Sequence, residues 1–199
     1  MSRVRNRTLR LAQIAMLTAL LILTLVPPLN QIKITAFYIV LSFLPVSIGA
    51  IVFGPRIGAL LGLFWGIGSF FQALAGMDNG MLYINYSVLL TLFALIVPRV
   101  LAGLLTGLLF LGTHRLLKKA PAGVRQVSFL LASAATPLIN SVLFLSAIYL
   151  CFSHFFPAGF LALIGMVVSV NSLTELIIGI VVGTTLSATM YHVVHKRTA

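Results

Sequence analysis

The sequence has very little negative charge. Its 199 residues include two carboxylates, Asp78 and Glu175, against thirteen lysines and arginines, and a single cysteine, Cys151. Two isolated acids cannot form the clusters that hydrolytic or metal-assisted catalysis uses, and one cysteine cannot form a disulfide within the chain. The sequence also lacks a phosphate-binding G-x-x-x-x-G-K-[ST] loop. We therefore expect no catalytic residue, no metal site and no cofactor, and we expect Cys151 to serve packing.

Apolar residues dominate the chain. Hydrophobic side chains make up 60% of it and charged ones 8%, a composition typical of membrane proteins. A helix of about 20 apolar residues crosses a hydrocarbon core of about 30 Å. The sequence predicts an all-α integral membrane protein, one domain over residues 1–199, with six transmembrane helices at 9–26, 37–53, 57–75, 98–117, 124–152 and 166–194. Residues 76–97 are predicted to form an outer loop, in which 87–97 is a packed or re-entrant helix; a seventh span is the alternative.

The basic residues predict the orientation. With six spans, all lysines and arginines except Lys33 and Arg99 fall on the side of the two termini. This is the positive-inside pattern, which places both termini in the cytoplasm and leaves no polybasic tract for nucleic acid. A seventh span would move the basic C-terminus outside, which disfavours it.

Polar residues inside the predicted spans are candidates for a solute site. Glu175 lies in the sixth span, where a charge costs at least ~2.5 kcal/mol, so such acids face a cavity, a partner or a solute. Asn171 precedes it by four residues and shares its helix face. Asn140 in the fifth span also needs a polar partner. The alternative for these residues is a hydrogen-bond clamp between helices.

The predicted outer side supplies the other candidates. Arg99 is expected at the outer mouth of the fourth helix, where it could bind a carboxylate or phosphate; snorkelling, or pairing with Glu175, is the alternative. Lys33 is the other outer cation, or else a solvated loop charge. Tyr83 and Tyr86 are expected to form an aromatic rim. These residues predict an outward-facing pocket for a small anionic or zwitterionic solute.

Small residues recur every four positions in several predicted helices. Gly54, Gly58, Gly62 and Gly66 are predicted to form a ridge on the third helix, and Ala15 and Ala19 have the same spacing on the first. Such stripes let helix backbones approach closely in a membrane. We interpret the glycines as packing within the bundle and leave the alanine pair open between internal packing and contact with a partner.

Four stretches resemble the substrate-binding S component of energy-coupling factor (ECF) transporters. They are the Ala15–Ala19 segment, the 44–62 hairpin, the Pro98–Gly103 segment, and Asn171 with Glu175. The resemblance implies a multi-pass subunit of the prokaryotic plasma membrane that binds a vitamin. It further implies docking, through Ala15 and Ala19, on a transmembrane coupling subunit that carries two ATPases.

Three features look most similar to pantothenate-type members of that group: the 69–72 segment, the long 76–97 loop and the Pro98-Arg99 pair. This likeness implies uptake of pantothenate, with folate, pyridoxine, riboflavin or cobalamin as alternative vitamins. A hypothesis from another class is a small membrane enzyme acting on a lipid or isoprenoid, which would require an acid cluster or metal ligands. A structural scaffold is a third hypothesis, but it leaves Glu175 without a purpose.

Overall fold

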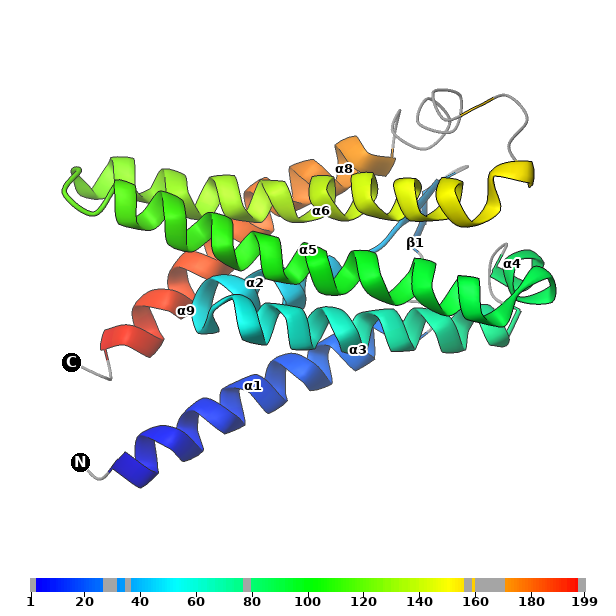
Figure 1. Ribbon diagram of the computed structural model, residues 1–199. Helices are drawn as coiled ribbons and strands as arrows, with labels where there is room; N and C mark the ends of the chain where they lie inside the picture. Colours follow the sequence, from blue (N-terminus) through cyan, green and yellow to red (C-terminus); the bar gives the residue numbers. More distant parts are fainter. Residues whose placement is uncertain are drawn as a thin grey trace.

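The protein is a bundle of helices with both termini at the same end (Figure 1). The computed structural model describes residues 3–26, 32–34, 37–76, 80–155, 159 and 171–196. Its helices are α1 (Arg3–Leu25), α2 (Phe43–Phe53), α3 (Pro55–Leu74), α4 (Gly80–Tyr86), α5 (Val88–Leu116), α6 (Ala122–Phe152), the 3-10 turn η1 (Ser153–Phe155), α8 (Asn171–Ile178), the π-helical turn η2 (Gly179–Gly183) and α9 (Thr184–Lys196). The strands β1 (Ile32–Ile34) and β2 (Phe37–Ile39) complete the described elements.

Five described helical segments are long and apolar enough to cross a membrane, namely Arg7–Leu25, Pro55–Leu74, Val88–Leu116, Gly123–Phe155 and Thr174–Val194. They correspond to the predicted first, third, fourth, fifth and sixth spans. The last is a single helical run, because α8, η2 and α9 follow one another without a break. Residues 166–170, the predicted start of that span, lie outside the described residues. The molecule is a helical membrane protein.

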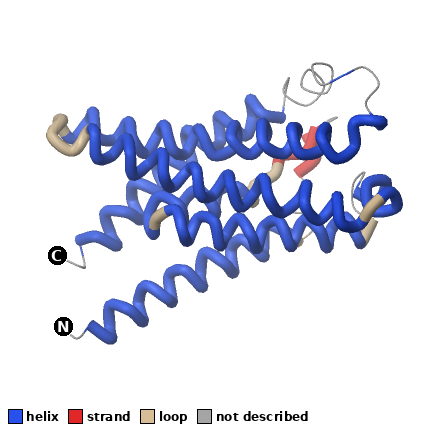
Figure 2. Tube along the Cα trace, in the orientation of Figure 1, coloured by secondary structure: helices blue, strands red, loops and turns tan. Residues whose placement is uncertain are grey.

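The predicted second span was wrong in its first half. Phe37–Ile39 is a strand, paired antiparallel with Ile32–Ile34 so that Lys33 lies opposite Tyr38, and Figure 2 shows this hairpin in red among the helices. Aromatic and β-branched residues favour strands when a partner strand is available. The helix that remains, α2, has 11 residues and rises about 16 Å, too little to span a bilayer. Ten of those residues are buried, so α2 is a core helix.

The predicted start of the fourth helix was also wrong. Helix α5 begins at Val88, where the Ser87 side chain accepts a hydrogen bond from the Leu90 N–H at 3.4 Å, and it continues through Pro98 to Leu116. The 87–97 segment is thus the first part of a spanning helix, neither a separate re-entrant helix nor loop. Proline is tolerated inside transmembrane helices, where neighbouring groups satisfy the freed carbonyl. Pro98 therefore misled the prediction of a helix start.

Helices α3 and α5 approach each other closely along the α3–α5 seam, which is formed by Gly58, Gly62 and Gly66 on α3 and by Gly103 and Gly107 on α5. A Cβ on Gly62 would overlap the carbonyl oxygen of Arg99, and one on Gly103 would overlap the carbonyl oxygen of Gly58. The glycines therefore pack one backbone directly on another, as predicted. This contact fixes the register of α5 against α3.

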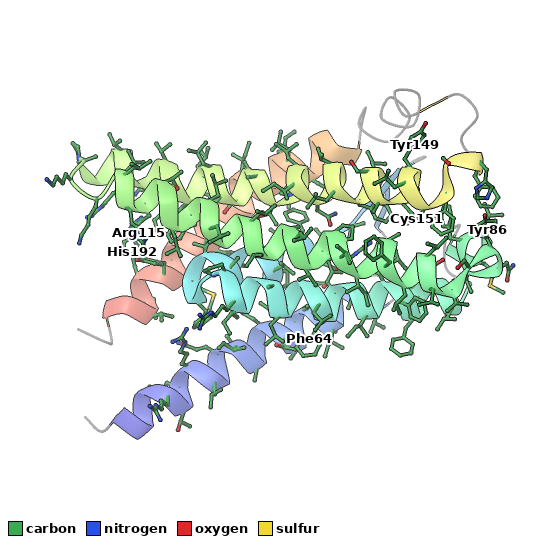
Figure 3. The ribbon with its side chains drawn as sticks, in the orientation of Figure 1. Phe64, Tyr86, Arg115, Tyr149, Cys151 and His192 are labelled. Atoms are coloured by element: carbon green, nitrogen blue, oxygen red, sulfur yellow. The ribbon has the colours of Figure 1, made fainter. Side chains whose placement is uncertain are left out.

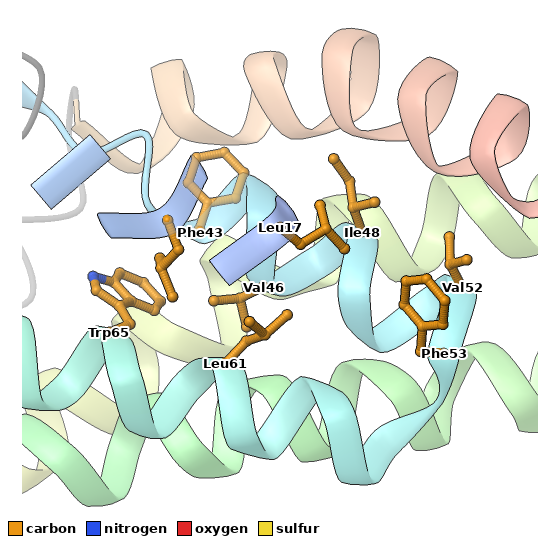
Figure 4. Close-up of a cluster of buried hydrophobic side chains, with 9 residues drawn as sticks. Leu17, Phe43, Val46, Ile48, Val52, Phe53, Leu61 and Trp65 are labelled. Carbon is orange, nitrogen blue, oxygen red and sulfur yellow. The ribbon is translucent and has the colours of Figure 1, made fainter. Parts of the chain in front are cut away.

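The core has an apolar part and a hydroxyl-bearing part. Figure 4 shows the apolar cluster, to which α2 contributes most of the side chains and α1 and α3 the others. Beside it, Thr136 on α6 donates to Ser47 on α2 at 3.0 Å and accepts from Thr106 on α5 at 3.1 Å. These bonds link three helices at one depth.

Candidate functional site

Arg99 lies in the middle of α5, buried among aromatic rings. Its side chain is 9% exposed, and its guanidinium carbon lies 5.3 Å from the ring centroid of Trp65 and 4.9 Å from that of Phe144. One nitrogen, Nη1, donates to the Leu95 carbonyl at 2.7 Å, while Nε is buried with no described partner. The predicted position at the outer mouth of the helix was wrong, because α5 begins more than two turns earlier.

No carboxylate neutralises Arg99 among the residues that the structure describes. The structure has no ion pair between Arg99 and Glu175, although it describes both side chains. A buried cation without a counter-ion is costly, and ring faces compensate only part of that cost. The arrangement can accept a carboxylate or phosphate between Trp65 and Phe144, with the guanidinium fork providing the hydrogen bonds.

Glu175 lies in α8 and contacts the β-hairpin. It is 9% exposed, and its Oε1 accepts a hydrogen bond from the Val40 N–H at 3.3 Å. Val40 directly follows β2, so the hairpin brings a backbone donor to an acid far away in sequence. One turn later, Gly179 begins the π-helical turn η2. Single π-turns inside α-helices frequently occur at functional sites.

Asn140 on α6 has a buried side-chain oxygen, Oδ1, with no partner in the described part of the chain. Phe144, which contacts Arg99, lies one turn further along and therefore on the same face of α6. An unpaired buried amide oxygen costs about 1–3 kcal/mol. Asn140 is thus an acceptor available to a bound solute that carries a hydroxyl or amide N–H.

The helix registers place these three polar residues at one depth. Helices α5 and α6 are antiparallel, and the Thr106 hydroxyl on α5 is hydrogen-bonded to the Thr136 hydroxyl on α6. Two turns further along both helices, the guanidinium of Arg99 on α5 contacts the ring of Phe144 on α6. A Cβ on Gly179 would lie 2.9 Å from the Ser133 carbonyl oxygen and 3.6 Å from Cγ of Pro137 on α6. One turn back from Gly179, Glu175 therefore lies at the level of Asn140. Three helices contribute polar groups to one layer of the bundle.

Asn171 and Lys33 are described in backbone only. Asn171 is the first residue of α8 and precedes Glu175 by four positions, which keeps both on one helix face, as predicted. Lys33 lies in β1, in the hairpin that leads to Val40. Both side chains lie outside the described residues.

Tyr83 and Tyr86 on α4 pack onto Phe152 at the end of α6, and Tyr86 lies at the end of the bundle far from the termini (Figure 3). The ring centroid of Tyr83 lies 4.8 Å from that of Phe152, and that of Tyr86 lies 4.3 Å from His154. Burial raises the pKa of the Tyr83 phenol above its usual value. These rings form an aromatic cluster that joins α4 to α6.

Ala15 and Ala19 are both exposed on α1. Leu17 and Leu21, on the other side of the helix, are 2% and 0% exposed and attach α1 to α2 and α3. Ala15 and Ala19 are therefore not among the residues of the described apolar clusters.

A cavity of about 460 Å³ lies at the end of the bundle that carries the termini, away from Arg99 and Glu175. Arg10, Phe53, His114 and Tyr191 are among its lining residues. The sequence pattern predicted neither this cavity nor the contact of Trp65 with Arg99. The sequence showed Trp65 as an aromatic residue in the middle of a predicted span. Aromatic residues at such positions most often serve packing, so Trp65 was not predicted as a site residue. Among the described residues, no group of three His, Cys, Asp or Glu could hold a metal ion.

Comparison with known proteins identifies the family. The chain matches the model of the family "ECF transporter, substrate-specific component" over residues 9–191. It is 34% identical over 154 residues to the pantothenic acid transporter PanT of Lactococcus lactis subsp. cremoris, covering 72% of this chain and 73% of that protein. It is 30% identical over 117 residues to the pantothenate transporter PanT of Leuconostoc mesenteroides subsp. mesenteroides, covering 58% of this chain and 52% of that protein. The chain belongs to the substrate-specific components of ECF transporters, which are integral membrane subunits of transporters and not enzymes.

Proposed function

We propose that this substrate-specific component binds pantothenate in the layer formed by Arg99, Asn140 and Glu175, and passes it to an ATP-driven coupling module. The observation that carries the proposal is the buried guanidinium of Arg99, which has two ring neighbours and no described carboxylate partner. Such a group favours a ligand that brings its own negative charge. Two relatives are named as transporters of pantothenate.

The chemistry of pantothenate matches this layer group by group. Its carboxylate would pair with Arg99 between Trp65 and Phe144, as bidentate arginine–carboxylate pairs do. Its hydroxyls would donate to Glu175, and its amide N–H to Oδ1 of Asn140. Asn171 and Lys33 are further candidates from α8 and the hairpin. Nε of Arg99 and Oδ1 of Asn140, which have no described partner, would each gain one from the ligand.

The proposed topology has six membrane passes with both termini in the cytoplasm. The hairpin and α2 together form the short second pass, which the length of α2 alone does not span. The basic residues that follow the positive-inside pattern include Arg115, which lies at the end of the bundle with the termini (Figure 3). The opposite end, with α4 and the aromatic cluster, would then face outward and receive the vitamin.

The proposed partners are a transmembrane coupling subunit and two ATPase subunits in the prokaryotic plasma membrane. Ala15 and Ala19 form a small, exposed stripe on α1. In a bilayer, such a stripe permits close contact with a helix of another protein. We propose this stripe as the docking seam.

The test is direct identification of the bound vitamin and of the contribution of Arg99. Small molecules extracted from the detergent-purified protein would be identified by mass spectrometry, and affinities would be measured by titration calorimetry. The two ligands would be pantothenate and its alcohol analogue, in which CH₂OH replaces the carboxylate. Arg99→Ala should weaken pantothenate at least about tenfold more than the alcohol, because only the acid loses an ion pair.

A matched control is Arg125→Ala, which removes an exposed arginine from the start of α6 and should leave both affinities unchanged. Equal losses for acid and alcohol in Arg99→Ala would mean that Arg99 supports the structure only. Recovery of folate, pyridoxine or riboflavin in place of pantothenate would refute the substrate while leaving the family assignment intact.

A further inference from the structure

We infer a second binding site, for the phosphate headgroup of an anionic phospholipid, in the cavity at the end of the bundle that carries the termini. This cavity lies at a different end of the molecule from the proposed vitamin layer, which is formed by Arg99, Asn140 and Glu175. It therefore does not depend on which vitamin is bound.

The cavity lies where α1 separates from the other helices. Toward its N-terminus α1 diverges from the bundle (Figure 1), and the cavity of about 460 Å³ is lined by α1, the end of α2, the end of α5 and α9. Its cationic wall is formed by Arg7, Arg10 and Arg115, beside His114. Its remaining wall is largely apolar and includes Val52 and Phe110.

No Asp or Glu is among the described residues that line this cavity. The chain has two carboxylates. Glu175 lies in the vitamin layer, bonded to Val40, and Asp78 belongs to the segment between α3 and α4. Three arginines line this cavity and no acid is among its described lining residues, so the cavity favours binding of an anion from outside the chain.

Arg10 is held in place at the edge of the cavity. Its Nη2 donates to the Phe53 carbonyl at 3.2 Å, and its guanidinium carbon lies 6.0 Å from the Phe53 ring centroid. An arginine fixed by a backbone carbonyl and a ring loses little further freedom when it binds. The planar donor fork of arginine also matches a phosphate group.

The apolar surroundings favour a lipid over a soluble phosphate. Leu9 and Leu11, near Arg10 on α1, are 42% and 67% exposed, and such side chains on a spanning helix face acyl chains. A ligand here would meet cations and hydrocarbon together, as a phospholipid does at the membrane surface. Basic pockets between transmembrane helices recognise anionic headgroups in this way.

The experiment uses the full-length protein in mixed micelles with phosphatidylglycerol or with phosphatidylcholine. Lipid retention is measured by native mass spectrometry and the unfolding temperature by a thermal scan. Arg7→Gln with Arg115→Gln removes two cavity cations that are both exposed, so folding is expected to be retained. Lys119→Gln with Arg125→Gln removes two exposed charges that do not line the cavity.

Wild type should retain phosphatidylglycerol at least about tenfold more than phosphatidylcholine. In the cavity variant, Arg7→Gln with Arg115→Gln, this preference should fall about tenfold. In the control variant, Lys119→Gln with Arg125→Gln, the preference should stay within about twofold of wild type. Equal losses in both double variants would reduce the effect to general surface charge and overturn the site. Equal protection by millimolar inorganic phosphate or glycerol phosphate would assign the site to a soluble anion instead. If the cavity variant retained the lipid but no longer co-purified with the coupling module, an acidic protein segment would be the ligand and the proposal would be wrong.

Discussion

The α3–α5 seam and helix α1 both have small residues spaced four positions apart, but these residues are buried in the seam and exposed on α1. In the seam, Gly58 meets Gly103 so closely that neither position has room for a Cβ. On α1, Ala15 and Ala19 have the same four-residue spacing and lie exposed. One stripe is covered by the protein's own backbone, and the other is open to whatever lies beside the bundle.

This difference separates internal stability from contact with a partner. Helices in lipid associate by close packing of small residues, within one chain or between two chains. A stripe already covered by the chain contributes to its fold, whereas an uncovered stripe has no such role. Substitutions that enlarge the small residues should therefore have different consequences in the two regions.

The largest effect is expected in the seam. Gly103→Leu should prevent accumulation of folded protein, because the new side chain would overlap the Gly58 carbonyl and force α3 and α5 apart. Overpacking of a core costs about 1–3 kcal/mol, and a clash with backbone exceeds that range. The measurement is the monodisperse fraction of a fluorescent fusion in size-exclusion chromatography.

Gly112→Leu is the matched control, since a Cβ at Gly112 on the same helix meets nothing within 4 Å. It should give a wild-type chromatogram. Comparable yields of Gly103→Leu and Gly112→Leu would show that the seam is not needed for the fold.

The next effect concerns α1. Ala15→Trp with Ala19→Trp should leave vitamin binding by the isolated protein unchanged and abolish uptake in cells that contain the coupling module, because large side chains would hold a partner helix away. Met16→Trp with Leu20→Trp is the control, an exposed pair with equal spacing about 100° around the helix. The readout is uptake of radiolabelled pantothenate. Loss of binding together with uptake would mean that the alanine face supports the fold, and the two regions would then not differ.

A smaller effect is expected in the proposed vitamin site, which lies outside both stripes and to which Asn171 and Glu175 are assigned. Glu175→Gln and Asn171→Ala should each weaken binding at least about tenfold without loss of folding, since removing a buried hydrogen-bond partner costs about 1–3 kcal/mol. Titration calorimetry gives the affinities and a thermal scan the stability. Thr185→Val is the control, because Thr185 is exposed on α9 and its hydroxyl donates only to the Val181 carbonyl one turn earlier among the described groups. Wild-type affinity in both variants would refute the assignment of these residues.

The smallest effect is expected in the aromatic cluster. Tyr86→Ala should weaken pantothenate binding by less than about threefold, because Tyr86 is 54% exposed and packs on His154 outside the polar layer. Phe71 is another exposed aromatic residue, and Phe71→Ala is the control that should leave the affinity for pantothenate unchanged. A loss above tenfold in Tyr86→Ala would place this ring in the vitamin site itself.

Long apolar runs could be predicted from the sequence because each helix satisfies its own backbone in lipid, whatever its neighbours are. For the spans that contain α1, α3 and α6, most of the predicted ends therefore lie within a few residues of the observed ones. The hairpin before α2 could not be predicted, because Phe37–Ile39 becomes a strand only by pairing with Ile32–Ile34. The same limit explains Pro98, whose effect depends on the groups around it.

The sequence by itself determined the class of protein, the asymmetry of its basic residues, the glycine ridge and the presence of Glu175 in a span. Each is a property of composition or spacing along one segment. Only the tertiary structure decided that Arg99 is buried between Trp65 and Phe144, that the backbone of Val40 reaches Glu175, and that Ala15 and Ala19 face outward. Depth, partners and exposure depend on which helix faces meet, and those contacts join residues far apart in the chain.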